Sequence, residues 1–478
     1  MRSLPLLCAT LLCVGSAVTA RADRPDTPNS NEPFRFDAGD VVESYDSSAG
    51  NFRIFYTRAG SNAVPNTDAN TNDVPDRVEA LAALYEQVAA FYTDKGFRPV
   101  ISDVNNAGGH GGDERFDVYL VDFGKSADGA YRREACDAEQ HCSGFIVQEN
   151  DFVGYGYPSV EYADRVLASH EYFHAVQAAY DNGETTIFVE GSAVWATEYF
   201  DSTLKDFEGF VDGYLDRCDR SLYLPQTGPV DPFSYGAAIF FEFLSERFTP
   251  SILAELWTDS DGMTDWFTAL GPLLTQHATS FGDELVTFAT WNLYTAKRAN
   301  PSVAYQRGAS YPLVKIEAVT LPLDKPSQRV FPSSTTYLGA APAGRSKLAA
   351  ELIFDAGIDG APLKLLVALR SGDTIATPVA STDGKTLAID VGTADEAIFY
   401  LVNTATSGES LRPALCLGAP DEVEACAKQY RPATTPTTPS DQGGCRVTGD
   451  GELDASALVV AAVLLVLGAR VARRRRIG

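Results

Sequence analysis

The chain has 478 residues, of which 45% are hydrophobic and 21% are charged, a composition that fits a globular protein of two or more domains. This composition excludes a chain that is disordered throughout. The formal net charge is −26, and such an acidic surface repels nucleic acid and anionic membranes, so we expect neither as a partner.

The N-terminal segment, residues 1–22, has the pattern of a secretory signal peptide. Arg2 precedes an apolar run, which ends in small residues at Ala20 and Ala22 where a signal peptidase can cleave. We therefore expect an exported protein, in a compartment where disulfides form. Residues 23–34 are polar and proline-rich and predict a loose leader.

The part of the chain between the two terminal segments contains five cysteines: Cys136, Cys142, Cys218, Cys416 and Cys426. The short spacings favour one disulfide between Cys136 and Cys142 and another between Cys416 and Cys426, although spacing does not fix connectivity. Cys218 is then left over. No pair has the two-residue gap of a zinc knuckle, so these cysteines do not predict a zinc site.

A polar loop follows the strand predicted at 51–58. Its oxygen-bearing side chains recur at the spacing of an EF-hand calcium loop: Asp68, Asn70, Asn72, Asp76 and Glu79. Asp73 stands where that loop normally has glycine, and aspartate is one of the few other residues that tolerate a left-handed backbone. The alternative is a polar Asx turn that caps the helix predicted at 76–92.

Helices and strands mix up to about residue 310, and shorter β-rich segments follow. The first part predicts strands at 115–124 and 144–150 and helices at 159–180, 186–200, 236–248, 253–257 and 283–296. The second part, 311–430, predicts strands at 349–356, 363–371, 386–392 and 397–405. We therefore expect an α+β fold, with a domain at 23–310 followed by a small β-sandwich-like domain at 311–430.

Residues 431–444 form a Pro/Thr linker that leads to a C-terminal segment at 445–478. This segment has a Gly-Cys pair, a polar spacer, an apolar stretch and an arginine cluster, and it resembles the MYXO-CTERM sorting signal of surface proteins. That resemblance implies processing or anchoring at Cys445. The alternative is a single-pass anchor, although the apolar stretch is shorter than the about 20 residues of a stable span. Both interpretations place the body of the protein outside the cytoplasm, with membrane contact only through this segment.

The stretch ASHEYFHAVQAAYD contains two of the five histidines, His170 and His174, with Glu171 directly after the first. Side chains four residues apart lie on the same face of a helix, so both imidazoles can bind one ion. In such an HExxH helix, zinc lowers the pKa of a water molecule and the glutamate takes its proton. The alternative is a buried helix with two core histidines.

A catalytic zinc site has three protein ligands and one open position. Glu190 lies on the next predicted helix, sixteen residues after His174, and a tight turn would bring it back over the histidines. Its neighbours are apolar, and a carboxylate there is costly to bury unless it binds a metal or a proton. Glu190 is therefore the predicted third ligand.

HEYFH followed by EGSAVWATE resembles the gluzincin branch of zinc metallopeptidases. With TNDVPDRVE, FDVYLVDFG and the C-terminal signal, residues 50–300 are similar to secreted metalloproteases of myxobacteria. The resemblance implies a zincin-like domain in which His170, His174 and Glu190 bind zinc and Glu171 is the general base.

The chain departs from the gluzincin pattern at two places. The family has an aspartate where this chain has Val194, which leaves Glu198 as the next acid that could orient a histidine. The family's oxyanion-binding tyrosine is replaced by Phe233, and Tyr235 two positions later is the predicted donor, with a core aromatic as the alternative. The resemblance also implies that the strand at 144–150 is an edge strand that pairs with substrate.

These patterns predict an exported, surface-anchored zinc peptidase that acts on polypeptides, with Zn²⁺ and Ca²⁺ as the metals. A second hypothesis is a non-catalytic adhesion protein with a structural zinc, which would need a fourth protein ligand. A third is an inactive precursor that requires processing. The remaining histidines, His110, His141 and His277, are expected to have surface roles, and the oligomeric state stays open.

Overall fold

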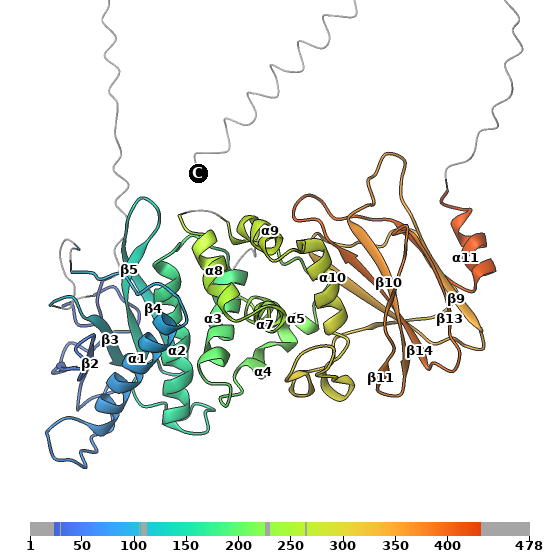
Figure 1. The fold of residues 1–478 in the computed structure, drawn as a ribbon. Helices are drawn as coiled ribbons and strands as arrows, with labels where there is room; N and C mark the ends of the chain where they lie inside the picture. The colour runs from blue at the N-terminus through green and yellow to red at the C-terminus, as the bar shows by residue number, and fades with distance from the viewer. Residues whose placement is uncertain are drawn as a thin grey trace, which may run out of the picture. The chain divides into compact units, whose positions relative to one another are not determined.

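The computed structural model describes residues 23–28, 30–104, 106, 112–224, 230–262 and 265–431 (Figure 1). The predicted signal peptide, the Pro/Thr linker from Pro432 onward and the C-terminal segment with Cys445 lie outside these residues. Within the described ranges, no helix is both long and apolar enough to cross a membrane.

The first part of the chain forms a five-stranded sheet in the order β1-β2-β3-β5-β4. Its strands are β1 (Glu43–Asp46), β2 (Phe52–Tyr56), β3 (Phe116–Val121), β4 (Gly129–Cys136) and β5 (Cys142–Glu149). Strands β2, β3 and β5 run parallel, whereas β1 and β4 are antiparallel to their neighbours. The three strands predicted from sequence are confirmed as β2, β3 and β5, and β1 and β4 were not predicted.

The prediction that 144–150 is an edge strand is wrong. All eight residues of β5 are buried and the strand lies between β3 and β4, so β4 is the edge on this side of the sheet. The reason is that β4, which the sequence did not reveal, pairs with β5 on the side opposite β3.

Two long helices cover one face of this sheet: α1 (Asp76–Asp94) and α2 (Val160–Ala178). Apolar side chains on α1 recur at helical spacing and are buried against the sheet and α2: Val78, Leu81, Tyr85, Val88 and Tyr92. Helix α2 begins at Ser159, whose hydroxyl accepts a hydrogen bond from the Tyr162 amide at 3.1 Å. Both helices agree with the sequence prediction.

The N-terminal residues cover the opposite face, so the prediction of a loose leader is wrong. Arg24 is 5% exposed, and its guanidinium bonds to three carboxylates, those of Asp103, Asp117 and Glu134. Phe36 joins a core with Phe145 and other side chains of the outer face. A buried arginine that neutralises buried carboxylates is held firmly, because each group would be costly to leave unpaired. The polar composition of residues 23–34 did not reveal this anchor.

A helical region follows α2. Its helices are α3 (Thr186–Phe200), α4 (Phe207–Phe210), α5 (Asp212–Leu215), α6 (Pro232–Gly236), α7 (Ala238–Arg247), α8 (Ser251–Asp259), α9 (Trp266–Gln276) and α10 (Phe281–Trp291). They bury a cluster of large aromatic side chains, including Phe188, Trp195, Phe240, Trp257 and Trp266. Such rings bury large apolar areas, so this cluster holds α3 in place beside α2.

Two further sheets form the C-terminal part. The larger contains β6 (Glu317–Val319), β8 (Ser334–Ala340), β10 (Leu363–Ser371), β11 (Thr374–Ile375), β12 (Val379–Ala380) and β14 (Glu396–Asn403). The smaller contains β7 (Leu323–Lys325), β9 (Lys347–Ile353), β13 (Thr386–Asp390) and β15 (Ala414–Gly418), and α11 (Pro420–Ala427) follows it. Side chains of both sheets share one apolar core, which includes Leu348 and Phe399.

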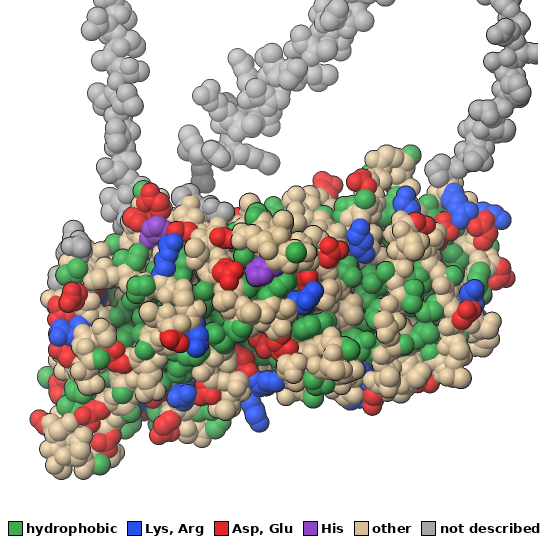
Figure 2. Space-filling view, in the orientation of Figure 1, with side chains coloured by type: hydrophobic (Ala, Val, Ile, Leu, Met, Phe, Trp, Pro, Cys, Tyr) green, Lys and Arg blue, Asp and Glu red, His purple; other side chains and the backbone are tan. Residues whose placement is uncertain are grey.

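The larger sheet also contacts the helical region. Tyr337 donates a hydrogen bond to the Ala289 carbonyl at 2.6 Å, and Thr290 and Tyr400 are hydrogen-bonded at 2.9 Å. The chain therefore has a mixed α and β fold, with three sheets among the described residues, compatible with the α+β class. Figure 2 shows acidic side chains spread over the face in view, with lysine and arginine between them.

Both predicted disulfides are confirmed. Cys136–Cys142 joins β4 to β5, and Cys416–Cys426 joins β15 to α11. Cys218 is free and buried.

Candidate metal centre

Helices α2 and α3 bring three donor atoms together. His170 and His174 lie one turn apart on α2, and their Nε2 atoms are 3.1 Å from each other. Glu190 is in the second turn of α3, and its Oε2 lies 3.5 Å from Nε2 of His170 and 3.6 Å from Nε2 of His174. The three atoms form a nearly equilateral triangle.

This triangle has the size that a zinc ion requires. A triangle with these sides has its centre about 2.0 Å from each corner, and zinc keeps about 2.0–2.2 Å from histidine nitrogen and carboxylate oxygen. The three side chains are 13%, 13% and 15% exposed, so solvent reaches the donors only in part. The donor set of two imidazoles and one carboxylate fits zinc, and a catalytic zinc would need the fourth position to be open.

The charges at this centre are strongly coupled. Burial by itself would lower the pKa of His174, but the Glu190 carboxylate raises it to about 9. Burial would raise the pKa of Glu190, yet the two histidines hold it well below its usual range. Glu190 is therefore an ionised donor, and a metal ion that binds here would displace a proton from His174.

Gln177 orients one of the two histidines and was missed by the sequence analysis. Its Oε1 lies 2.8 Å from Nδ1 of His174, while its Nε2 donates to the Val189 carbonyl at 2.8 Å and to the Ser192 hydroxyl at 3.1 Å. Since the amide is held from α3, its oxygen accepts from His174 Nδ1–H, which leaves Nε2 free for a metal. The signal was present in the sequence, because Gln177 follows His174 by three residues and lies on the same helix face.

Glu198, considered for the same role, lies elsewhere. It is 6% exposed and pairs with Arg307, and it has no contact with either histidine among the described residues. Val194 is fully buried in the core beside it. The orienting group therefore comes from the histidine helix rather than from α3.

The side chain of Glu171, a residue of α2, contacts the edge strand β4. It is 7% exposed, and its Oε2 accepts a hydrogen bond from the backbone N–H of Tyr131 at 2.7 Å. A Cβ on Gly129 would come within 2.6 Å of Leu167 Cδ1 and 3.1 Å of Glu171 Cγ, so a larger residue there requires these side chains or the strand to shift. The glutamate is close enough to the histidines for all three to contribute to one metal cluster.

Tyr235 faces the same centre. Its ring centroid lies 6.4 Å from that of His170, and it stacks on Phe210 at 5.2 Å. Burial raises the pKa of Tyr235 well above its usual value, and the nearby carboxylates of Glu190 and Glu171 raise it further. Phe233, in contrast, is buried against Tyr214. Tyr235 therefore lies beside the candidate metal centre, and its role as a donor stays a prediction.

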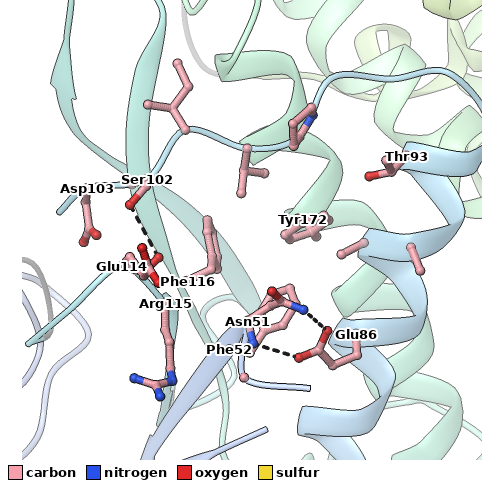
Figure 3. A pocket seen from close by; sticks show the side chains of 17 residues that line it. Asn51, Phe52, Glu86, Thr93, Ser102, Asp103, Glu114, Arg115, Phe116 and Tyr172 are labelled. Carbon is pink, nitrogen blue, oxygen red and sulfur yellow. Dashed lines mark hydrogen bonds between the residues drawn. The ribbon is translucent and has the colours of Figure 1, made fainter. Parts of the chain in front are cut away.

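Two cavities lie on either side of α2. One of about 270 Å³ opens beside His174 and Glu190. The other, of about 620 Å³, lies between α1 and the sheet, with Tyr172 and Phe116 among its apolar residues and the hydrogen-bonded pair Asn51 and Glu86 at its rim (Figure 3). The larger cavity contains none of the predicted site residues.

The five residues of the predicted calcium loop lie together at the start of α1, with Asp76 and Glu79 in the first turn of the helix. Glu79 accepts hydrogen bonds from the side-chain amides of Asn70 and Asn72 at 2.8 and 2.7 Å, and Asp68 and Asp76 accept from backbone amides of the loop. Asp73 has a φ of 67°, the left-handed conformation that its position predicts. These contacts are those of an Asx-type loop, and calcium binding stays a prediction.

His141 and His277 lie partly exposed, and His110 is outside the described residues. A second group of potential ligands contains Asp137, Glu139 and His141. Both ring nitrogens of His141 are already engaged, with Asp137 at 2.8 Å and Asp261 at 2.7 Å. This histidine therefore connects the β4–β5 turn to the residues after α8.

The structure thus brings His170, Glu171, His174, Glu190 and Tyr235 to one place and separates Glu198 from them. Gln177 and strand β4 complete the surroundings. No protein-family model matches this chain, and no curated protein matches it.

Proposed function

We propose that the protein is an exported zinc-dependent peptidase with a zincin-like catalytic domain. The observation that carries this proposal is the triangle of His170, His174 and Glu190 donor atoms, which has the dimensions of a zinc site and lies beside a buried glutamate. Zinc bound by these residues supplies a Lewis acid that polarises a carbonyl group and lowers the pKa of water.

Glu171 is the general base in this proposal. A carboxylate that accepts one hydrogen bond, from the Tyr131 amide, still has lone pairs with which to take a proton from the attacking water. The same glutamate then returns the proton to the leaving amine. The backbone contact with β4 fixes the carboxylate, which lowers the entropic cost of bringing it to the reacting water.

Tyr235 is the donor to the oxyanion that develops on the carbonyl. Its raised pKa keeps the phenol protonated at neutral pH, as a hydrogen-bond donor must be. Among the described residues β4 pairs with β5 alone, so its outer edge carries no further strand, and one N–H of that edge, that of Tyr131, already donates to Glu171. An extended polypeptide can add to such an edge through main-chain hydrogen bonds, which favours a polypeptide as substrate.

The test is cleavage of casein by the purified full-length protein, with and without a chelator, followed by addition of zinc. We expect the chelator to abolish cleavage, zinc to restore it, and Glu171→Gln to lower kcat by about 10²–10⁴-fold. Glu161→Gln is the matched control, because Glu161 is an exposed glutamate on the same helix.

A Glu171→Gln protein that retains zinc and cleaves as fast as the parent would disprove this mechanism. A parent protein that holds zinc and cleaves no substrate would instead favour the adhesion protein with a structural zinc.

A further inference from the structure

The cavity of about 270 Å³ beside the metal centre has two kinds of wall. His174 and Glu190 form one end. Tyr131 on β4, Ala178 on α2 and Val189 on α3 also line it and supply apolar surface. Its volume is near the lower limit of about 300 Å³ for ligand pockets, so it accommodates one side chain rather than a larger group.

Two acidic residues from the turn between α2 and α3 also line this cavity. Asp181 is 4% exposed, and its Oδ1 accepts the Gly183 amide at 2.6 Å. No donor among the described residues lies on its second oxygen. Glu184 accepts the Trp266 amide at 2.8 Å, a contact that holds it at the start of α9. Both carboxylates are therefore fixed in position and still have lone pairs for another donor.

No lysine or arginine among the described residues of the cavity wall offsets these two carboxylates. Of the described residues that line it, the charged ones are Asp181, Glu184, Glu190 and His174, and none is lysine or arginine. The pKa of Glu184 is raised to about 8 by burial and then by the carboxylates of Asp265 and Asp181. A buried carboxyl group whose pKa is raised in this way lacks a positively charged partner. An ammonium or guanidinium group of a ligand would supply one.

Given the proposed peptidase function, we infer that this cavity receives a lysine or arginine side chain of the substrate. The methylene groups lie along Tyr131, Ala178 and Val189, and the cationic end is bound by Asp181 and Glu184. Long basic side chains combine an apolar stem with a charged end, and the cavity offers a matching surface for each. The net charge of −26 favours the approach of the same substrates.

The test uses the full-length protein and a set of fluorogenic peptides that differ at one residue beside the scissile bond: lysine, arginine, norleucine, glutamine or glutamate. We expect kcat/KM for the lysine and arginine peptides to exceed that for the norleucine peptide at least tenfold. Asp181→Asn and Glu184→Gln should each reduce that ratio about tenfold. Asp259→Asn, which removes an exposed charge from α8, should leave the ratio unchanged.

A second measurement is binding of the same peptides to the Glu171→Gln protein, by fluorescence anisotropy. Tighter binding of the lysine peptide that weakens on adding Asp181→Asn supports the cavity assignment, even if the parent cleaves nothing and the proposed function fails. Cleavage and binding without preference for basic residues, or a preference that both substitutions leave intact, overturns the assignment while the peptidase function stands.

Discussion

Replacing Gln177 by leucine removes the contact that orients His174. The amide bridges α2 and α3, the helices of the candidate metal centre, with Oε1 at 2.8 Å from His174 Nδ1 and Nε2 at 2.8 Å from the Val189 carbonyl. Leucine has a similar volume but no hydrogen-bonding group. The imidazole then loses the partner that selects its tautomer, and the Val189 carbonyl loses the side-chain donor that it has beside its helical bond.

We expect Gln177→Leu to weaken zinc binding by about 10–100-fold, since partners of metal-bound histidines have effects of this size. This factor corresponds to a loss of about 1.4–2.7 kcal/mol in the free energy of zinc binding. The loss of each buried hydrogen bond of the Gln177 amide should lower folding stability by about 0.5–1.5 kcal/mol, and Gln177 is 2% exposed. The assays are a competitive zinc titration with a chromophoric chelator and urea unfolding of the metal-free protein.

Gln177→Glu is the informative control. A carboxylate still accepts the proton of His174 Nδ1, so zinc affinity should stay near that of the parent, whereas the contact with the Val189 carbonyl is lost. If Gln177→Leu binds zinc within twofold of the parent, the amide does not set the tautomer and the reasoning is wrong.

Three other predictions concern the surroundings of the site. Gly129→Ala should displace β4 from Glu171, which should lower the rate of cleavage and cost about 1–3 kcal/mol of folding stability. Gly156→Ala, at a position with free space, should change neither quantity. Equal activity of the two variants would contradict the role of β4. The pKa of Glu184 is raised on folding to about 8, so the folded state holds a proton that the unfolded state loses near pH 4.5. The free energy of unfolding, measured in urea, should therefore fall as the pH rises from 5 to 8, and Glu184→Gln should make this pH dependence weaker. An unchanged pH dependence in the variant would show that Glu184 is not its source. If the loop at the start of α1 binds calcium, EGTA should lower the Tm of the parent protein but not that of Glu79→Gln. A Tm that calcium does not change in either protein would contradict calcium binding by this loop.

The elements that the sequence predicted are those whose own pattern specifies them. The apolar β5 and the periodic α1 and α2 are recognisable without knowledge of their neighbours. Strand β4, with the sequence GAYRREAC, has no such alternation. It is held by pairing with β5, by the Cys136–Cys142 disulfide and by the ion pair of Glu134 with Arg24. These partners are distant in sequence or follow from tertiary structure, so the edge strand was not predicted.

The candidate site likewise contains residues that local sequence predicts and residues whose position depends on tertiary packing. His170 and His174 are related by helix geometry, which fixes their separation wherever the helix lies. Glu190 depends on how α3 approaches α2, and it was predicted because an isolated carboxylate in an apolar helix is costly to bury. That electrostatic argument applies equally to Glu198, which instead pairs with Arg307. Burial cost therefore identifies which acids need a partner, but the packing of the helices decides whether that partner is a metal ion or an arginine.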